Sequence, residues 1–108
     1  MKKIMLLTLL IISGAVSAGE HEGKITSIVV RGDGAHYVNL SGDASGRASC
    51  HNGNFDIWVI KDEKSDLGKS QFAMLLAAYT SGNTVKIIGT NSCTRWHDAE
   101  DIDYVVLK

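Results

Sequence analysis

Hydrophobic and polar residues alternate in several short stretches of this chain, a pattern typical of strands with one buried face. Between residues 36 and 40, for example, Tyr37 and Asn39 face away from Val38 and Leu40. Segments rich in Gly, Asn, Asp and Ser separate these stretches and favour turns. We therefore predict five strands, at residues 23–30, 36–40, 55–60, 83–89 and 101–107.

One segment between the third and fourth strands changes to a helical period. Four side chains fall at the i, i+3, i+4 and i+7 positions of one helix face, which predicts an apolar stripe: Phe72, Leu75, Leu76 and Tyr79. Ser65 or Asp66 is suited to begin this helix as its N-cap. Gly82 is suited to end it, because glycine adopts the left-handed conformation that a helix C-terminus requires.

The predicted order is strand, strand, strand, helix, strand, strand, which makes the fold mainly β with one helix. This is the order of the OB-fold, a small closed Greek-key barrel. We expect a single OB-fold-like domain over residues 19–108. An open five-stranded sheet with the helix across one face is the alternative, and it would bury the same residues.

The first 18 residues have the pattern of a secretory signal peptide. Two lysines precede an apolar run at residues 4–12, and small residues follow. Val16 and Ala18 lie three and one residues before the proposed cut, where signal peptidase accepts small side chains. We therefore expect the mature chain to begin at Gly19, in the periplasm or outside the cell.

A permanent membrane anchor is the alternative for this segment. As a helix, the apolar run would span about 14 Å at 1.5 Å per residue, against about 30 Å for the hydrocarbon core of a bilayer. We therefore expect no membrane association after cleavage.

The chain contains two cysteines, Cys50 and Cys93. In an exported chain an even count predicts a disulfide. The two cysteines lie in the second-to-third and fourth-to-fifth connections, which share one end of an OB-fold barrel, so the predicted fold brings them together. A zinc site that adds His51 and His97 is the alternative, but neither cysteine belongs to a close CxxC pair.

The charge of the chain is nearly balanced, with 11 basic and 12 acidic residues. Nucleic-acid binding usually requires a basic stripe that neutralises phosphates, and the sequence has none. We therefore expect no nucleic-acid partner. No motif indicates a cofactor.

Four consecutive residues near Cys93 are candidates for a binding site: Arg95, Trp96, His97 and Asp98. Binding residues concentrate on loops that a rigid scaffold positions. An indole stacks on the C–H face of a sugar ring, and polar neighbours bind its hydroxyl groups. The alternative is that Trp96 folds back to cover the disulfide and one end of the barrel.

Two further groups of residues suggest chemistry but do not form a recognised motif. His36, His51 and His97 could serve a hydrolase, but no GxSxG, HExxH or paired-carboxylate arrangement is present, and packing or solvated histidines are the simpler interpretation. An acidic cluster lacks the spacing of a calcium loop and is interpreted as the solvated start of the last strand: Asp98, Glu100, Asp101 and Asp103.

The part of the chain from Cys50 to Leu107 resembles a group of small secreted proteobacterial proteins of unassigned activity. The shared pattern has a cysteine before an aromatic-rich strand, and then the features of the run GKSQFAMLLAAYTSGNTVKIIGTNSC at residues 68–93. These are a Gly-Lys helix start, a Leu- and Ala-rich helix that ends in Ser-Gly, and a strand before Gly-x-x-x-Cys. A tryptophan and an acidic residue precede the last strand, as in TRWHDAEDIDYVVL.

The order of elements and the Ser-Gly helix end are also similar to the B subunits of subtilase-type AB5 toxins. Those subunits are OB-fold pentamers that bind host glycans, so the resemblance implies glycan binding and ring assembly.

Together these patterns predict an exported binding module without catalytic activity, whose ligand is a glycan or another protein. The alternative is a structural or assembly subunit that forms a ring or docks on a larger exported partner. A small hydrolase ranks last.

Overall fold

The structure is a computed structural model, and it describes residues 18–52 and 56–108. The predicted signal peptide therefore lies outside the described residues except for Ala18. Phe55, at the predicted start of the third strand, also lies outside them.

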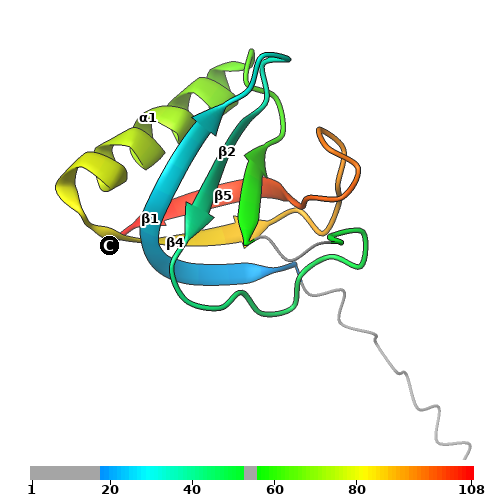
Figure 1. The fold of residues 1–108 in the computed structure, drawn as a ribbon, viewed down its shortest axis with the longest axis horizontal. Coiled ribbons are helices and arrows are strands. Elements are labelled where there is room, and N and C mark those ends of the chain that lie inside the picture. Colours follow the sequence, from blue (N-terminus) through cyan, green and yellow to red (C-terminus); the bar gives the residue numbers. More distant parts are fainter. Residues whose placement is uncertain (1–17, 53–55) are drawn as a thin grey trace, which may run out of the picture.

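Five strands form a closed barrel in the order β1-β2-β3-β5-β4, and one helix lies along its side (Figure 1). Neighbouring strands are antiparallel except β3 and β5, which are parallel. This is the predicted OB-fold-like topology. The elements are β1 (Glu20–Val30), β2 (His36–Leu40), β3 (Ile57–Ile60), α1 (Asp66–Ser81), β4 (Thr84–Gly89) and β5 (Asp101–Leu107).

Strand β1 closes the barrel because it belongs to two pairings. Its first half pairs with β4, from Glu20 opposite Ile88 to Lys24 opposite Thr84. After a register shift between Ile25 and Ser27, its second half pairs with β2. The strand thus starts three residues before the predicted position. The segment before Gly23 has no run of β-branched residues and is held in the sheet by β4, which is distant in sequence.

The interior of the barrel is built around Trp58, which is fully buried. Its indole Nε1 donates a hydrogen bond to Nδ1 of His21 at 3.0 Å. Since Nδ1 accepts this bond, Nε2 of the same ring carries the proton and donates to the Ser41 carbonyl at 3.0 Å. Trp58 and His21 are therefore core residues. The apolar side chains around them are Ile25, Val38, Leu40, Ile60, Leu75, Ala78, Val85, Ile87 and Ile102.

Both predicted ends of helix α1 are confirmed. The Ser65 hydroxyl accepts a hydrogen bond from the Gly68 N–H at 2.9 Å, as an N-cap does. Gly82 ends the helix with a φ of 71° in the left-handed region.

The predicted apolar stripe of α1 is wrong in part. Leu75 is buried, but Leu76 and Tyr79 are 41% and 48% exposed. The buried face of α1 is instead formed by Leu75 together with smaller or polar residues: Gly68, Gln71 and Ala78. A Cβ atom at Gly68 would lie only 1.9 Å from the Asp62 carbonyl oxygen, so this position allows a close approach that a larger side chain would prevent.

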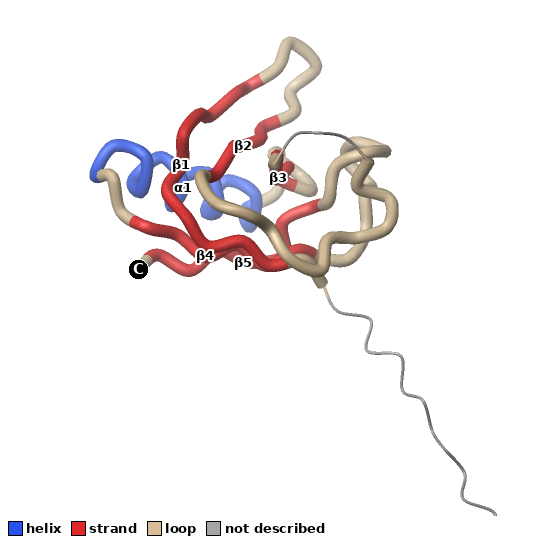
Figure 2. The backbone as a smooth tube through the Cα atoms, turned by 60° about the horizontal axis from the view of Figure 1, so that its bottom comes forward, coloured by secondary structure: helices blue, strands red, loops and turns tan. Residues whose placement is uncertain are grey.

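The predicted disulfide is present between Cys50 and Cys93, whose Cα atoms are 6.1 Å apart. It joins the β2–β3 and β4–β5 loops, and Figure 2 shows these long loops at the same end of the barrel. Because both sulfur atoms are used, the alternative of a zinc site on these cysteines is excluded. The bond indicates an oxidising compartment. None of the helical segments among the described residues is both long and apolar enough to cross a bilayer.

Replacing both cysteines, Cys50→Ser with Cys93→Ser, removes a cross-link between residues 43 positions apart. The chain-entropy model predicts a loss of about 4 kcal/mol in the free energy of unfolding. Urea titration followed by Trp fluorescence measures this loss, with Ser49→Ala as a control at an exposed neighbouring position. An unchanged urea midpoint in the double variant would contradict a stabilising role for the bridge.

Candidate functional site

Two buried carboxylates, Glu100 and Asp101, shape the loops at the disulfide end of the barrel. Both side chains are fully buried, so the predicted solvated start of the last strand is wrong for them. Glu100 accepts backbone hydrogen bonds from Gly19 at 3.1 Å, from Ala48 at 2.7 Å and from Asn91 at 3.0 Å. It therefore connects the N-terminal segment, the β2–β3 loop and the β4–β5 loop.

Asp101 organises the β4–β5 loop from the adjacent position. Its Oδ2 accepts hydrogen bonds from the backbone N–H and the hydroxyl group of Thr94, at 3.1 Å and 2.7 Å. Its Oδ1 accepts from the Arg95 backbone N–H at 3.2 Å. These bonds satisfy backbone donors in a segment that forms no strand, so the loop is fixed immediately before Trp96.

The Arg95 side chain connects this loop to Glu63, which follows the C-terminal end of β3. Its guanidinium forms two hydrogen bonds with Glu63, at 3.0 Å and 2.9 Å, and a third with the Asp33 carbonyl at 3.1 Å. The hydrogen bonds from Arg95 lower the pKa of Glu63 to about 2 from the ordinary 4.5, and the same pairing raises the pKa of Arg95. Arg95 therefore positions the loop, and its charge is largely neutralised by Glu63.

Trp96 lies half-buried against the outer face of the barrel. Its ring is 5.6 Å from that of Tyr37 on β2, and the Arg31 guanidinium lies 4.5 Å over it. A small second apolar cluster of Ile57, Val59 and Ala99 supports the two rings from below. Trp96 thus covers part of the outer face of β2 and β3.

A hollow of about 300 Å³ lies on this face of the barrel. Its lining residues come from β2, β3 and the β4–β5 loop: Tyr37, Asn39, Ile57 and Trp96. Tyr37 and Asn39 lie opposite Val59 and Ile57 in the β2–β3 register, which places all four side chains on the outer face. We name the hollow and Arg31 above it the β2–β3 face site.

Of the residues that form the β2–β3 face site, only Trp96 is among the binding residues predicted from the sequence. The alternation in residues 36–40 already placed Tyr37 and Asn39 together on the face away from the core. Combined with the general position of ligands on OB-folds, that alternation could have identified them. Arg31 gave no such signal, because its place over Trp96 depends on how two distant loops meet.

The other predicted binding residues lie near this site. His97 is exposed and Asp98 is half-buried. The Asp98 backbone carbonyl accepts a hydrogen bond from the Asn52 N–H at 3.0 Å, which adds a second link beside the disulfide.

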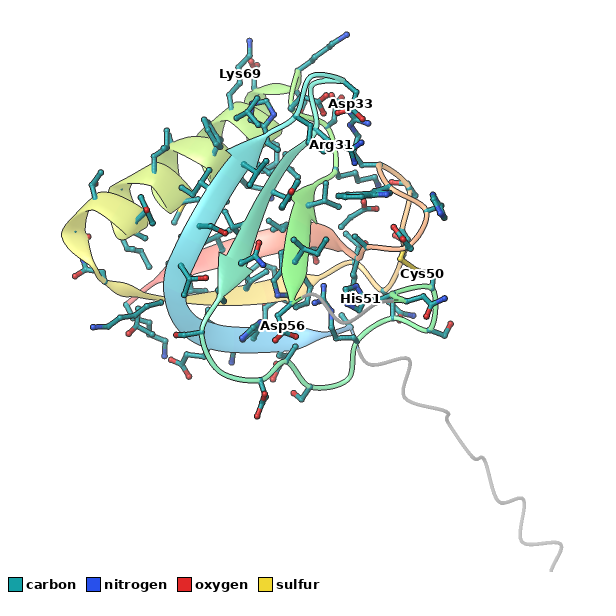
Figure 3. The ribbon with its side chains drawn as sticks, viewed as in Figure 1. Arg31, Asp33, Cys50, His51, Asp56 and Lys69 are labelled. Carbon is teal, nitrogen blue, oxygen red and sulfur yellow. A yellow bond between two sulfur atoms is a disulfide. The ribbon has the colours of Figure 1, made fainter. Side chains whose placement is uncertain are left out.

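Of the three histidines considered for a hydrolase, His51 and His97 lie in the two loops that the disulfide joins, and His36 lies in a strand. His36 is on β2, where its ring contacts Phe72 of α1 at 4.7 Å between centroids. His51 follows Cys50 in the β2–β3 loop, and Figure 3 shows it far from Arg31 and Asp33 at the tip of the β1–β2 hairpin. Within residues 18–52 and 56–108, no three His, Cys, Asp or Glu side chains form a group that could hold a metal ion.

The fold and the β2–β3 face site define the class of the protein: a disulfide-bonded OB-fold-like barrel with an aromatic hollow on its outer face. Comparison of the chain with protein-family models, with curated proteins and with solved structures finds no match. The class therefore rests on the topology and the site alone.

Glu63→Gln removes the charge that pairs with Arg95 and is expected to lower the free energy of unfolding at neutral pH. Because the folded-state pKa of Glu63 is about 2, below the ordinary 4.5, the wild-type advantage is complete above pH 4.5 and fades as the pH falls towards 2. Urea titrations of both proteins at about pH 7, pH 4 and pH 2 measure this trend.

Glu20→Gln is the matched control, since Glu20 forms an exposed ion pair with Lys86 at 3.9 Å. Such pairs contribute about 0–1 kcal/mol, so the control should differ little from wild type. A Glu63→Gln difference that persists unchanged down to about pH 2 would contradict the ion-pair explanation.

Proposed function

We propose that this protein is an exported binding module without catalytic activity, and that it binds a glycan on the β2–β3 face site. The observation that carries the proposal is the pair of aromatic rings, Tyr37 and Trp96, beside a hollow of about 300 Å³. OB-folds bind oligosaccharides and oligonucleotides on this same face and its flanking loops.

The chemistry of the site suits a sugar ring. The two aromatic rings supply apolar surface for the C–H face of the ring, as aromatic side chains do at binding sites. Asn39 supplies an amide that both donates and accepts hydrogen bonds, which matches hydroxyl groups. The Arg31 guanidinium lies over Trp96, with its Nε 3.7 Å from Oδ1 of Asp33. Both side chains are exposed, so the remaining N–H donors of Arg31 can bind a carboxylate or sulfate group of a glycan.

Hydrogen bonds within the chain hold the loop that carries Trp96. Asp101 fixes the backbone ahead of Trp96, and Arg95 ties the same loop to Glu63. A preformed site avoids the entropic cost of ordering its side chains when it binds. A loop that already has its binding conformation therefore binds with a smaller entropic cost than a loop that becomes ordered around its partner.

Export is the second part of the proposal. The signal-peptide pattern in the first 18 residues supports it, and so does the Cys50–Cys93 disulfide, which needs an oxidising compartment.

An assembly subunit is the second candidate function. Large hydrophobic side chains are exposed on α1 and β5: Leu67, Leu76, Tyr79, Tyr104, Val106 and Leu107. Exposed apolar surface of this kind favours contacts between subunits or with a partner protein. Light scattering on the purified mature domain separates the binding module from the ring-forming subunit. A monomer at high concentration would contradict ring formation.

Trp96→Ala is expected to weaken glycan binding by about tenfold or more, equivalent to ~1.4 kcal/mol, because it removes one of the two stacking rings. A glycan array with the wild-type domain identifies the ligand, and calorimetry then compares the affinities of wild type and variant. Arg31→Ala should weaken binding of acidic glycans selectively.

Tyr104→Ala is the matched control. Tyr104 is a tyrosine on β5 with 51% of its surface exposed, outside the β2–β3 face site. Its loss should leave the affinity unchanged. A thermal melt of each variant checks that the barrel is intact. A folded Trp96→Ala domain that binds the array ligand as tightly as wild type would contradict the proposed site.

A further inference from the structure

We propose that cleavage before Gly19 creates a buried ion pair: the new α-ammonium group of Gly19 binds the carboxylate of Glu100 and stabilises the mature barrel. This inference rests on the export part of the proposed function, because it requires the signal peptide to be removed at this bond. It does not depend on the ligand.

The backbone around Gly19 already has the required geometry. The Gly19 nitrogen lies 3.1 Å from Oε2 of Glu100, in a buried position. The Gly19 carbonyl accepts a hydrogen bond from the Gly89 N–H at 2.8 Å, which holds the residue beside the end of β4. The first atom of the mature chain would therefore be fixed within hydrogen-bond distance of a buried carboxylate.

The space at this position fits glycine alone. A Cβ atom on Gly19 would lie 2.7 Å from Oε1 of Glu100, 2.9 Å from the Trp58 ring and 3.1 Å from the Arg47 Cα. Contacts this close force a shift of the backbone or of a packed side chain. Glycine at position 19, the first residue after the predicted cut, therefore allows the N-terminus of the mature chain to lie next to Glu100.

Cleavage changes the chemistry of the Gly19 nitrogen. In the uncleaved chain it is an amide with one N–H and no charge. Hydrolysis of the Ala18–Gly19 peptide bond consumes one water molecule and leaves a carboxylate on Ala18 and an ammonium group with three N–H donors on Gly19. The amide already donates to a charged carboxylate. The ammonium adds a full positive charge, and with it a Coulombic attraction to Glu100 that the neutral amide lacks.

The charges around Glu100 leave a place for one more cation. The Arg47 guanidinium lies 3.8 Å over the Trp58 ring, with its Nε 3.9 Å from Oε1 of Glu100. Burial lowers the pKa of Arg47 to about 10, while the charges of Glu100 and Asp56 oppose this change. Arg47 thus lies on the Oε1 side of Glu100, and the α-ammonium of Gly19 places a second cation on the Oε2 side.

The two carboxylate oxygen atoms of Glu100 have different partners. Oε1 faces Arg47 and accepts from the Ala48 N–H, while Oε2 faces Gly19 and accepts from the Asn91 N–H. Both cations can therefore be bound without displacing a backbone hydrogen bond. The precursor should fold less stably than the mature chain, so processing sets the final stability of the domain.

The test compares two chains that differ by one residue. One begins at Gly19 with a free amine, and the other keeps Ala18, so that the Gly19 nitrogen stays an amide. In urea titrations, the unfolding equilibrium constant of the Ala18 chain should be about tenfold larger. Equal stability of the two chains would overturn the proposal.

Glu100→Gln in both chains shows whether this difference depends on the carboxylate. With the charge removed, the two chains should become equally stable. Asp101→Asn is the matched control, since Asp101 is an adjacent buried carboxylate that binds Thr94 and Arg95. In the Asp101→Asn variant, the difference in stability between the two chains should persist. If this difference also persists in Glu100→Gln, the proposal is overturned.

A second measurement does not rely on variants that might fail to fold. In the folded wild-type chain from Gly19, reductive methylation should modify the α-amine at least about tenfold more slowly than exposed lysines such as Lys24 and Lys69. Equal rates would overturn the ion pair. The intact mass of the exported protein locates the cut. A cut elsewhere overturns this inference but leaves the β2–β3 face site as proposed.

Discussion

The hydrogen bonds that the buried Glu100 carboxylate accepts are the interaction on which the disulfide end of this barrel depends. It accepts backbone hydrogen bonds from Gly19, Ala48 and Asn91, which belong to three segments far apart in sequence. An unsatisfied buried carboxylate would be strongly destabilising, so the three segments and Glu100 must adopt their positions together. The Cys50–Cys93 disulfide fixes the same two loops covalently. Loop position is thereby determined twice, once by a covalent bond and once by a polar network.

This constraint reaches the proposed binding site through the adjacent residue. Asp101 binds the backbone ahead of Trp96, and the Arg95 ion pair with Glu63 connects the loop to the far end of β3. The position of the indole against Tyr37 is therefore set by buried polar groups, whereas the barrel core supplies the surface beneath it. The proposed recognition face and the proposed processing site meet at this pair of carboxylates, which suggests that a correctly cleaved N-terminus supports the loops that present Trp96.

Local signals in the sequence were sufficient for much of the fold. Strands β2 and β5 have the predicted bounds, because their alternation is clear. Ser65 caps the helix through its hydroxyl group, and Gly82 ends it because a residue without a Cβ adopts the left-handed conformation. Long-range effects were not predictable in the same way. The polar start of β1 is a strand only because β4 pairs with it. Glu100 and Asp101 have the composition of a solvated segment but lie buried. Glu100 accepts from backbone groups of distant segments, and Asp101 accepts from Thr94 and Arg95 in the loop before it, and no periodicity reveals either set of bonds.

Amide hydrogen exchange measured by NMR tests the central role of Glu100 most directly. We expect the backbone amides of Ala48 and Asn91, although they lie in loops, to exchange as slowly as amides of the barrel strands, because both donate to a buried carboxylate. Exchange of these two amides as fast as that of exposed loop residues such as Gly42 and Gly46 would contradict it.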